Sequence, residues 1–396
     1  MPRYYERKGY NLSIRRELMD DASDYLDDLA KLFYTDEYIQ DYILTVFNST
    51  IPRHLDDRRP ERVVVEILKS PNPDAQMLPN GTLLLTTGLL SVLDSVEELT
   101  AIIVSEVAHY VLDHQVVNLV KERTKLRRAA IWSASLQLIA SGVDLALTLD
   151  RRDNYIPGSI VVDVGVVTHE VISLAIGHFG MGYSDRQAYD ADDIALRFLI
   201  RNGMDPSALG SALRKIEMYY IEAKDETVFT QEGGYANLNY RIGRLGHPVM
   251  SRDFNYLKKM SVVTTANDMM QLNSKNYWAA EKLAQKNIDN QLGTYDDYFV
   301  LIKANMGYAS SQEDNEKNLK RIRKIINSTS FTHLGLSKLE VLLLLRLDRE
   351  EEAIQALDAY LDQVLNFKQQ NVDEFDSLWA NEEIGWGNGL YRQLQH

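Results

Sequence analysis

One long apolar helix constrains the fold of this chain more than any other stretch. Apolar residues recur at steps of three and four from Val96 to about Arg123, the spacing that buries one face of an α-helix. Ser95 directly precedes the run, and Glu98 lies three residues after Ser95. This is a capping-box pattern, which satisfies the first free backbone N–H groups of a helix. A chain with such a helix must bury it, so we expect the other elements to pack around it.

Polar side chains at the centre of this helix point to chemistry. Glu106 and His109 occupy the second and last positions of the pattern H-E-x-x-H, in which two His one turn apart bind zinc and the Glu polarises the metal-bound water. Ser105 occupies the first position. Glu and His three residues apart on a helix occur often by chance, so the surroundings of the motif decide its meaning.

Two flanking segments fall in the order and spacing of one family. Upstream, Met77 to Leu90 reads M-L-P-N-G-T-L-L-L-T-T-G-L-L, and downstream, Ser184 to Asp192 reads S-D-R-Q-A-Y-D-A-D. From about Tyr38 to about Phe254 the chain therefore resembles the M48 metallopeptidases. Members carry L-P-x-G and G-L-L, then H-E-x-x-H, then S-x-x-x-E-x-x-A-D, whose Glu is the third zinc ligand.

The resemblance implies a zincin-like domain in which two of the three zinc ligands are missing. Ser105 stands where the first His is expected, and Ala188 stands where the ligand Glu is expected. His109 is then the remaining ligand position. Glu106 holds the general-base position but has no metal-activated water to deprotonate, so we expect it to be idle.

The resemblance also implies residues around this site. Asp192 matches the Asp that orients a ligand His, and we expect it to accept a hydrogen bond from the Ser105 hydroxyl instead. A His-Pro pair closes the domain in many members, and His247 fits it. In zinc proteases a strand beside the active-site helix binds the substrate backbone, and we expect Thr82 to Thr87 to be that strand. The alternative is that this segment belongs to an ordinary hairpin of the core. The cleft candidates on that strand are Thr82, Leu83, Leu84 and Leu85.

These residues favour a non-catalytic, peptide- or protein-binding member of the M48 fold that carries no cofactor, because catalytic zinc needs three protein ligands. The alternative is an active zinc metalloendopeptidase whose ligands come from other positions, such as His169 or Asp190. A third hypothesis makes Ser105 a nucleophile with His109 as its base. No strained turn presents this Ser, which argues against that hypothesis.

Charge and composition narrow the partners. The net charge of -14 excludes nucleic acid, since phosphate binding needs a basic face. The absence of Cys excludes disulfides and Cys-ligated zinc. The apolar stretch from Ala129 to Leu149 contains Asp144, and a charge at the membrane centre costs about 2.5 kcal/mol or more. We expect a buried or membrane-apposed helix there, so proximity to a membrane stays open.

The compartment depends on processing. Met1 to Tyr10 is polar and lacks the apolar core of a signal peptide, which by itself indicates a cytoplasmic protein. Relatives that pair this domain with helical repeats are usually exported in bacteria. If a signal has been removed, we expect a periplasmic or lipid-anchored protein instead.

The expected fold class is α+β, mostly α, in two domains. Residues 1–55 form a helical cover on the first domain, and 56–261 form the M48-like domain, with strands at about Arg62 to Leu68 and Thr82 to Thr87. Residues 262–396 resemble tetratricopeptide-like repeats, with a plain helical bundle as the alternative. Such stacks bind peptides or proteins on a concave surface, where we expect Trp278, Tyr295 and Tyr298.

Overall fold

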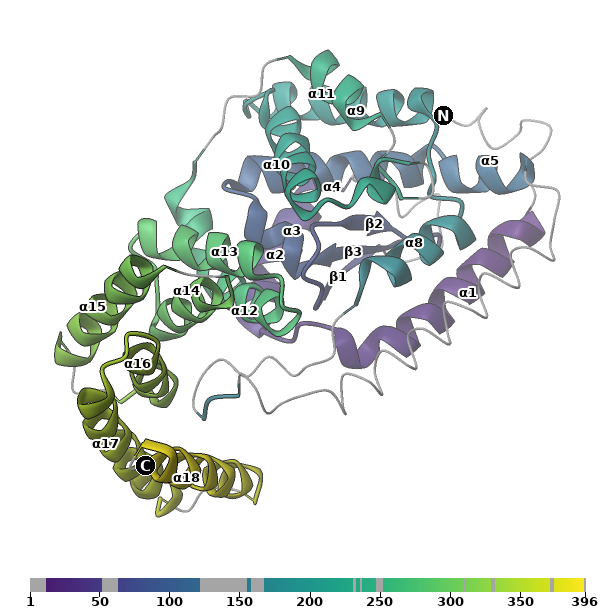
Figure 1. Ribbon diagram of the computed structural model, residues 1–396. Helices are drawn as coiled ribbons and strands as arrows, with labels where there is room; N and C mark the ends of the chain where they lie inside the picture. Colours follow the sequence, from purple (N-terminus) through teal and green to yellow (C-terminus); the bar gives the residue numbers. More distant parts are fainter. Residues whose placement is uncertain are drawn as a thin grey trace. The chain divides into compact units, whose positions relative to one another are not determined.

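The computed structural model describes residues 12–51, 63–121, 155–157, 167–230, 233–235, 237–246, 252–308, 311–328, 332–370 and 374–394. The described chain is mostly helical with one small sheet, which confirms the predicted α+β class (Figure 1). It divides into two compact units, the first made of residues 1–149 and 164–267 and the second of residues 150–163 and 268–396. The helix α12 (Phe254–Asn273) contributes to both units.

The sheet of the first unit has three strands in the order β1-β3-β2. The central strand β3 (Thr82–Thr86) pairs in parallel with β1 (Val64–Leu68) and antiparallel with β2 (Ala75–Met77). Every residue of β3 is buried. The prediction that Thr82, Leu83, Leu84 and Leu85 form the cleft edge is therefore wrong, because both edges of β3 are already paired. The edge strand that lies toward the predicted site is β2.

The apolar run that begins at Val96 forms two helices instead of one. Ser95 caps α4 (Val96–Val111) by accepting from the Glu98 N–H at 3.2 Å. The helix ends at Val111 and not near Arg123, because Asp113 adopts a left-handed backbone with φ of 54°. A second helix, α5 (His114–Lys121), begins directly after it.

Helices from later in the chain enclose α4. It packs most extensively against α9 (Asp185–Arg201). The helix α9 begins with the predicted capping box of Ser184 and Gln187. The next helix, α10 (Ala208–Ala223), also packs against α4 (Figure 1). Nearly every residue of α4 from Glu98 to Tyr110 is buried as a result. The helix is thus the centre of the first unit.

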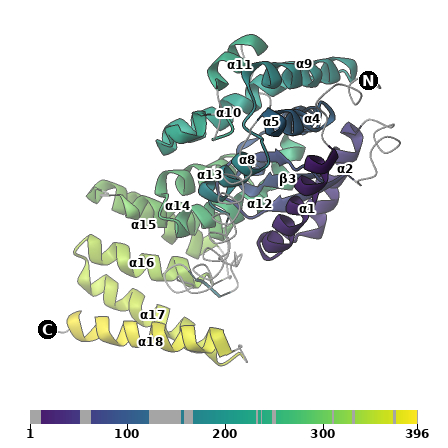
Figure 2. The same cartoon turned by 90° about the vertical axis from the view of Figure 1, so that its right-hand side faces the viewer.

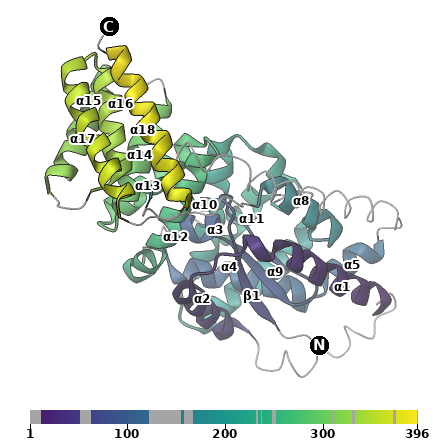
Figure 3. The same ribbon diagram turned by 90° about the horizontal axis from the view of Figure 1, so that it is seen from below.

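Shorter elements complete the first unit. The helix α2 packs on α4 and lies beside β1 (Figure 3). A separate cluster of apolar side chains joins α1 to α8 and the neighbouring parts of the sheet. These remaining elements are α1 (Leu12–Leu29), η1 (Ala30–Leu32), α2 (Glu37–Thr50), α3 (Thr87–Val92), α8 (His169–His178), η2 (Glu226–Phe229) and α11 (Leu238–Leu245).

No helix in the described ranges is both long enough and apolar enough to cross a membrane. The predicted apolar helix from Ala129 to Leu149 lies outside the described residues, as does the polar segment from Met1 to Tyr10.

The second unit consists of successive helices that pack on their neighbours in sequence. The contacts join α13 to α14, α15 to α16, α16 to α17 and α17 to α18, and α14 also packs on α16 (Figure 2). One apolar cluster runs through the whole unit. The helices are α13 (Tyr277–Asp289), α14 (Tyr295–Gly307), α15 (Gln312–Ser328), α16 (Leu334–Arg346), α17 (Glu350–Lys368) and α18 (Glu374–Leu394).

Candidate functional site

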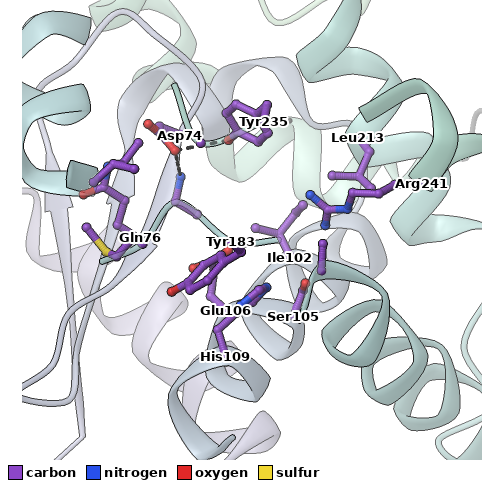
Figure 4. A pocket seen from close by; sticks show the side chains of 15 residues that line it. Asp74, Gln76, Ile102, Ser105, Glu106, His109, Tyr183, Leu213, Tyr235 and Arg241 are labelled. Carbon is purple, nitrogen blue, oxygen red and sulfur yellow. Dashed lines mark hydrogen bonds between the residues drawn. The ribbon is translucent and has the colours of Figure 1, made fainter. Parts of the chain in front are cut away.

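A small cavity lies in the first unit between the edge strand β2 and the middle of α4 (Figure 4). Its volume is about 50 Å³, which is room for a few water molecules but not for a large peptide side chain. The walls come from β2, α4, α8, α9, α10, α11 and three connecting loops. The lining residues are Asp74, Ala75, Gln76, Ile102, Ser105, Glu106, His109, Ile176, Met181, Tyr183, Ala188, Leu213, Gly234, Tyr235 and Arg241.

Four predicted site residues line this one cavity. Ser105, Glu106 and His109 reach it from α4, because positions three and four apart share a helix face. Ala188 faces it from α9. Ser105 is buried, and its hydroxyl has no hydrogen-bond partner among the described residues. A buried hydroxyl in a folded protein normally has a hydrogen-bond partner, and this one faces a cavity with room for a few waters.

His109 is held between two aromatic neighbours. Its ring stacks on Tyr183, with centroids 3.6 Å apart, and its Nδ1 lies 3.0 Å from the Nδ1 of His114. Burial lowers the pKa of His109 well below its ordinary value, and it lowers the pKa of His114 to about 4. Both rings are therefore neutral at neutral pH, and one Nδ1–H donates to the other Nδ1.

Two acids of the cavity wall also have shifted pKa values. Burial raises the pKa of Glu106 to about 8, with a further contribution from the nearby Asp74. Burial likewise raises the pKa of Asp74 to about 7, although the Tyr235 hydroxyl donates to Asp74 Oδ1 at 3.1 Å. Glu106 Oε2 accepts from the backbone N–H of Met77 at 3.3 Å. Near neutral pH these two carboxyl groups carry less negative charge than exposed acids would.

Arg241 was not predicted as a site residue, and it enters the cavity wall from α11 (Figure 4). Its Nε donates to Asp192 Oδ2 at 3.0 Å and its Nη2 donates to Asp192 Oδ1 at 2.7 Å, a bidentate pair in which both residues are buried. The expected hydrogen bond from Ser105 to Asp192 is therefore wrong, since Arg241 takes both carboxylate oxygens. Burial alone would lower the pKa of Arg241, but Asp192 raises it, so the guanidinium stays charged.

A weak signal for Arg241 was present in the sequence. Arg241 follows Leu238 by three residues and precedes Ile242, and both of these apolar residues are buried. An Arg at that spacing falls on the buried face of a short helix and needs an acidic partner. The partner, Asp192, is far away in sequence, so the pattern alone does not name it.

Comparison with known proteins assigns the domain. A family model described as peptidase family M48 matches residues 36–266, which is more than half of the chain. The chain belongs to this family. The match includes the whole cavity wall described above, and it confirms the resemblance found in the sequence. No curated protein matches the chain.

Two residues considered as alternative zinc ligands, His169 and Asp190, do not line the cavity. His169 on α8 contacts the Ser173 hydroxyl at 3.1 Å and is not a lining residue. Asp190 does not line the cavity either, although its charge raises the pKa of His114. His247 lies outside the described residues. Within the described ranges, no group of three or more His, Asp, Glu or Cys is placed to hold a metal.

The residues predicted to bind a partner belong to the second unit. Trp278 is half-buried on α13, with the Lys282 ammonium 5.9 Å from its ring centre. Tyr295 and Tyr298 lie on α14, where both are half-buried against the apolar cluster. Each of the three therefore keeps part of its surface open to solvent while packing on the unit.

Proposed function

We propose that this chain is a non-catalytic M48 protein that binds peptides or other proteins. The observation that carries the proposal is the charged Arg241 guanidinium on the wall of the cavity where the family motif expects a zinc ion. A zinc ion would bring two further positive charges beside this guanidinium. Because Arg241 binds both carboxylate oxygens of Asp192, this acid no longer attracts a cation, and zinc finds no compensating negative charge there.

The chemistry of the donors supports the same conclusion. Catalytic zinc takes His, Cys or carboxylate ligands and needs three of them, with one open position for water. Ser105 offers a hydroxyl that stays protonated near neutral pH, and Ala188 offers no donor. His109 is then the one remaining ligand of the motif, and a single His does not make the three-ligand set. On these grounds the described residues do not fit a zinc site, and we derive no catalytic step through the metal.

The contacts of Glu106 support a structural role for this residue instead of a catalytic one. A general base must reach the proton that it removes, but Glu106 Oε2 instead accepts from the Met77 N–H. Its neighbour Asp74 accepts from Tyr235, again within the protein. Both acids therefore serve contacts inside the protein.

Binding is assigned to the second unit, whose stacked helices we interpret as tetratricopeptide-like repeats. Consecutive helices that pack in pairs expose one continuous surface for a peptide or protein. Trp278, Tyr295 and Tyr298 would supply aromatic contacts, which are common among residues that dominate interfaces. Deletion of residues 268–396 should abolish capture of a native partner while leaving the first unit folded by circular dichroism. Full capture by the truncated chain would remove the repeats from the proposal.

Metal analysis of the purified full-length protein tests the loss of catalysis directly. We expect well below one zinc per chain by inductively coupled plasma mass spectrometry. We also expect no cleavage of casein that a chelator such as 1,10-phenanthroline suppresses. About one zinc per chain with chelator-sensitive cleavage would establish the alternative, an active zinc endopeptidase with ligands from other positions.

A further inference from the structure

The outward backbone groups of β2 can be identified from its pairing with β3. Leu78 N donates to Thr82 O at 2.7 Å, and Thr86 N donates to Asp74 O at 3.1 Å, on either side of the three-residue strand. Hydrogen-bonded pairs alternate along an antiparallel ladder, so Gln76 also bonds inward to β3. Ala75 and Met77 therefore direct their N–H and C=O groups away from the sheet.

Side chains of the protein already occupy three of these four outward groups. The Met77 N–H donates to Glu106 Oε2 at 3.3 Å, and the Met77 carbonyl accepts from Gln115 Nε2. The Ala75 N–H donates to Asp74 Oδ1 at 2.8 Å. Among the described residues, only the Ala75 carbonyl lacks such a contact.

Outward groups on an edge strand are the ones that another strand would bind. A peptide that adds to a sheet takes the N–H and C=O of alternate residues, and an uncapped edge also invites pairing with a second copy of the chain. Here the Met77 N–H contacts a partly buried side chain and the Met77 C=O contacts a buried one, and the cavity beside them has room for only a few waters. An incoming strand must first displace two side chains.

The cap on the Met77 carbonyl is tied into the cavity wall. Gln115 is buried, and its Nε2 also lies 3.4 Å from the Tyr183 hydroxyl. Tyr183 in turn stacks on His109. Glu106 and Gln115 come from two consecutive helices, α4 and α5, so both caps depend on the turn at Asp113. The arrangement holds the edge from two sides.

We propose that Glu106 and Gln115 are backbone caps that close the β2 edge to an extended peptide strand. The inference rests on the proposed function in one respect, because a Glu106 that serves as a cap is not available as a general base. Peptide partners then bind this protein without pairing to β2, unless the caps are removed. Glu106 is a positioning residue for β2 in this role.

Amide hydrogen exchange at Met77 in the full-length protein tests the first cap. Glu106→Gln keeps an acceptor oxygen at the same place, whereas Glu106→Ala removes it. We expect the Met77 amide to exchange about tenfold faster in the Ala variant than in the wild type, and at nearly the wild-type rate in the Gln variant. Thermal unfolding followed by circular dichroism shows that each variant is folded. Unchanged Met77 protection in a folded Ala variant would overturn the proposal.

Strand addition itself is tested with a fluorescein-labelled peptide of alternating Thr and Val residues, followed by fluorescence anisotropy. We expect Glu106→Ala/Gln115→Ala to bind it at least about tenfold more tightly than the wild type, and Glu106→Gln to show no gain. Gln115→Ala alone opens the carbonyl side and provides a second route if the double variant fails to fold. Equal binding by the wild type and a folded opened variant would contradict a closed edge.

The two proposals fail separately. Zinc in the wild type, together with a Met77 amide whose protection depends on Glu106, would overturn the non-catalytic function but support the caps. A zinc-free protein in which the protection of the Met77 amide does not depend on Glu106 would support the non-catalytic function and overturn the caps.

Discussion

The two halves of α4 solve the problem of buried polar groups in opposite ways. In the first half, Glu98 accepts from the Asp94 N–H at 2.7 Å, from the Ser211 hydroxyl at 2.6 Å and from the Lys215 ammonium at 2.6 Å. In the second half, the Ser105 hydroxyl has no partner among the described residues, and across the cavity neither has Asp74 Oδ2. The first half is therefore fixed by a fully satisfied network, whereas the second half faces a cavity.

The largest expected effect is at the satisfied half. Lys215→Met leaves Glu98 and Asp94 buried without their cation, so we expect the free energy of unfolding in urea to fall by about 3–5 kcal/mol. The exposed Lys258 on α12 gives a matched control, since Lys258→Met should stay within about 0.5 kcal/mol of the wild type. A loss below about 1 kcal/mol for Lys215→Met would end the contrast between the two halves.

Rebuilding the metal site tests the other half. Ser105→His and Ala188→Glu together restore three zinc ligands with His109, but Arg241 still places a positive charge beside them. We expect the triple variant that adds Arg241→Met to bind zinc about 100-fold more tightly than the double variant, or roughly 2.8 kcal/mol. Each single change should bind zinc only weakly, because the third ligand completes the set. Calorimetric titration measures all of these affinities.

Two outcomes of that titration would contradict the expectation. A double variant that matches the triple variant would show that Arg241 does not oppose the metal, and Lys258→Met in place of Arg241→Met controls for the loss of one positive charge. A folded triple variant that binds no better than the singles would show that α4 and α9 no longer hold the ligand geometry. The larger side chains may cost stability, since overpacking costs about 1–3 kcal/mol, so folding is checked first.

The pH dependence of stability distinguishes Asp74 from an ordinary acid. Its pKa is about 7 in the folded chain against 3.8 for the free side chain, so the native state retains a proton that the unfolded state has lost. The free energy of unfolding is then highest below about pH 4 and falls as the pH rises toward 7, by up to about 4 kcal/mol. Asp74→Asn should remove that component of the slope, as measured by urea unfolding at several pH values. Asp28→Asn, on an exposed position of α1, is the control, and an unchanged slope for Asp74→Asn would contradict the assignment.

The smallest expected effect compares two buried serines. Ser105→Ala removes a hydroxyl that has no partner, so the free energy of unfolding should stay the same or rise by about 0.5–1 kcal/mol. Ser211→Ala removes the hydroxyl that donates to Glu98 and should lower it by about 1–2 kcal/mol. Urea unfolding of the two variants side by side gives the comparison. Equal losses would mean that Ser105 has a stabilising contact after all.

Local patterns in the sequence predicted much of the fold. The caps at Ser95 and Ser184 and the strands β1 and β3 were found because caps and β-branched runs depend on neighbouring residues. The order of the strands was not predictable in this way, since pairing joins residues that are distant in sequence. The strand β2 was missed because its three residues are too few to show alternation.

The site shows the same division. The helical spacing placed Ser105, Glu106 and His109 on one face, and the family motif added Ala188, so four lining residues were predictable. Arg241 was not, because its importance depends on Asp192, which α9 brings to it only in the folded chain. The turn at Asp113 was also missed, and with it the separate helix that supplies Gln115.

The bidentate pair of Arg241 and Asp192 has a consequence for descent. Under the proposed non-catalytic function, a His at Ser105 or a Glu at Ala188 by itself gives only two ligands with His109 and therefore no complete zinc site. Loss of Arg241 by itself leaves Asp192 buried and unpaired, which destabilises the fold. On that proposal, each single change toward a zinc site is neutral or destabilising. For a chain with this pair, the gain of a zinc site needs several substitutions at once, so the pair makes that gain improbable by single substitutions.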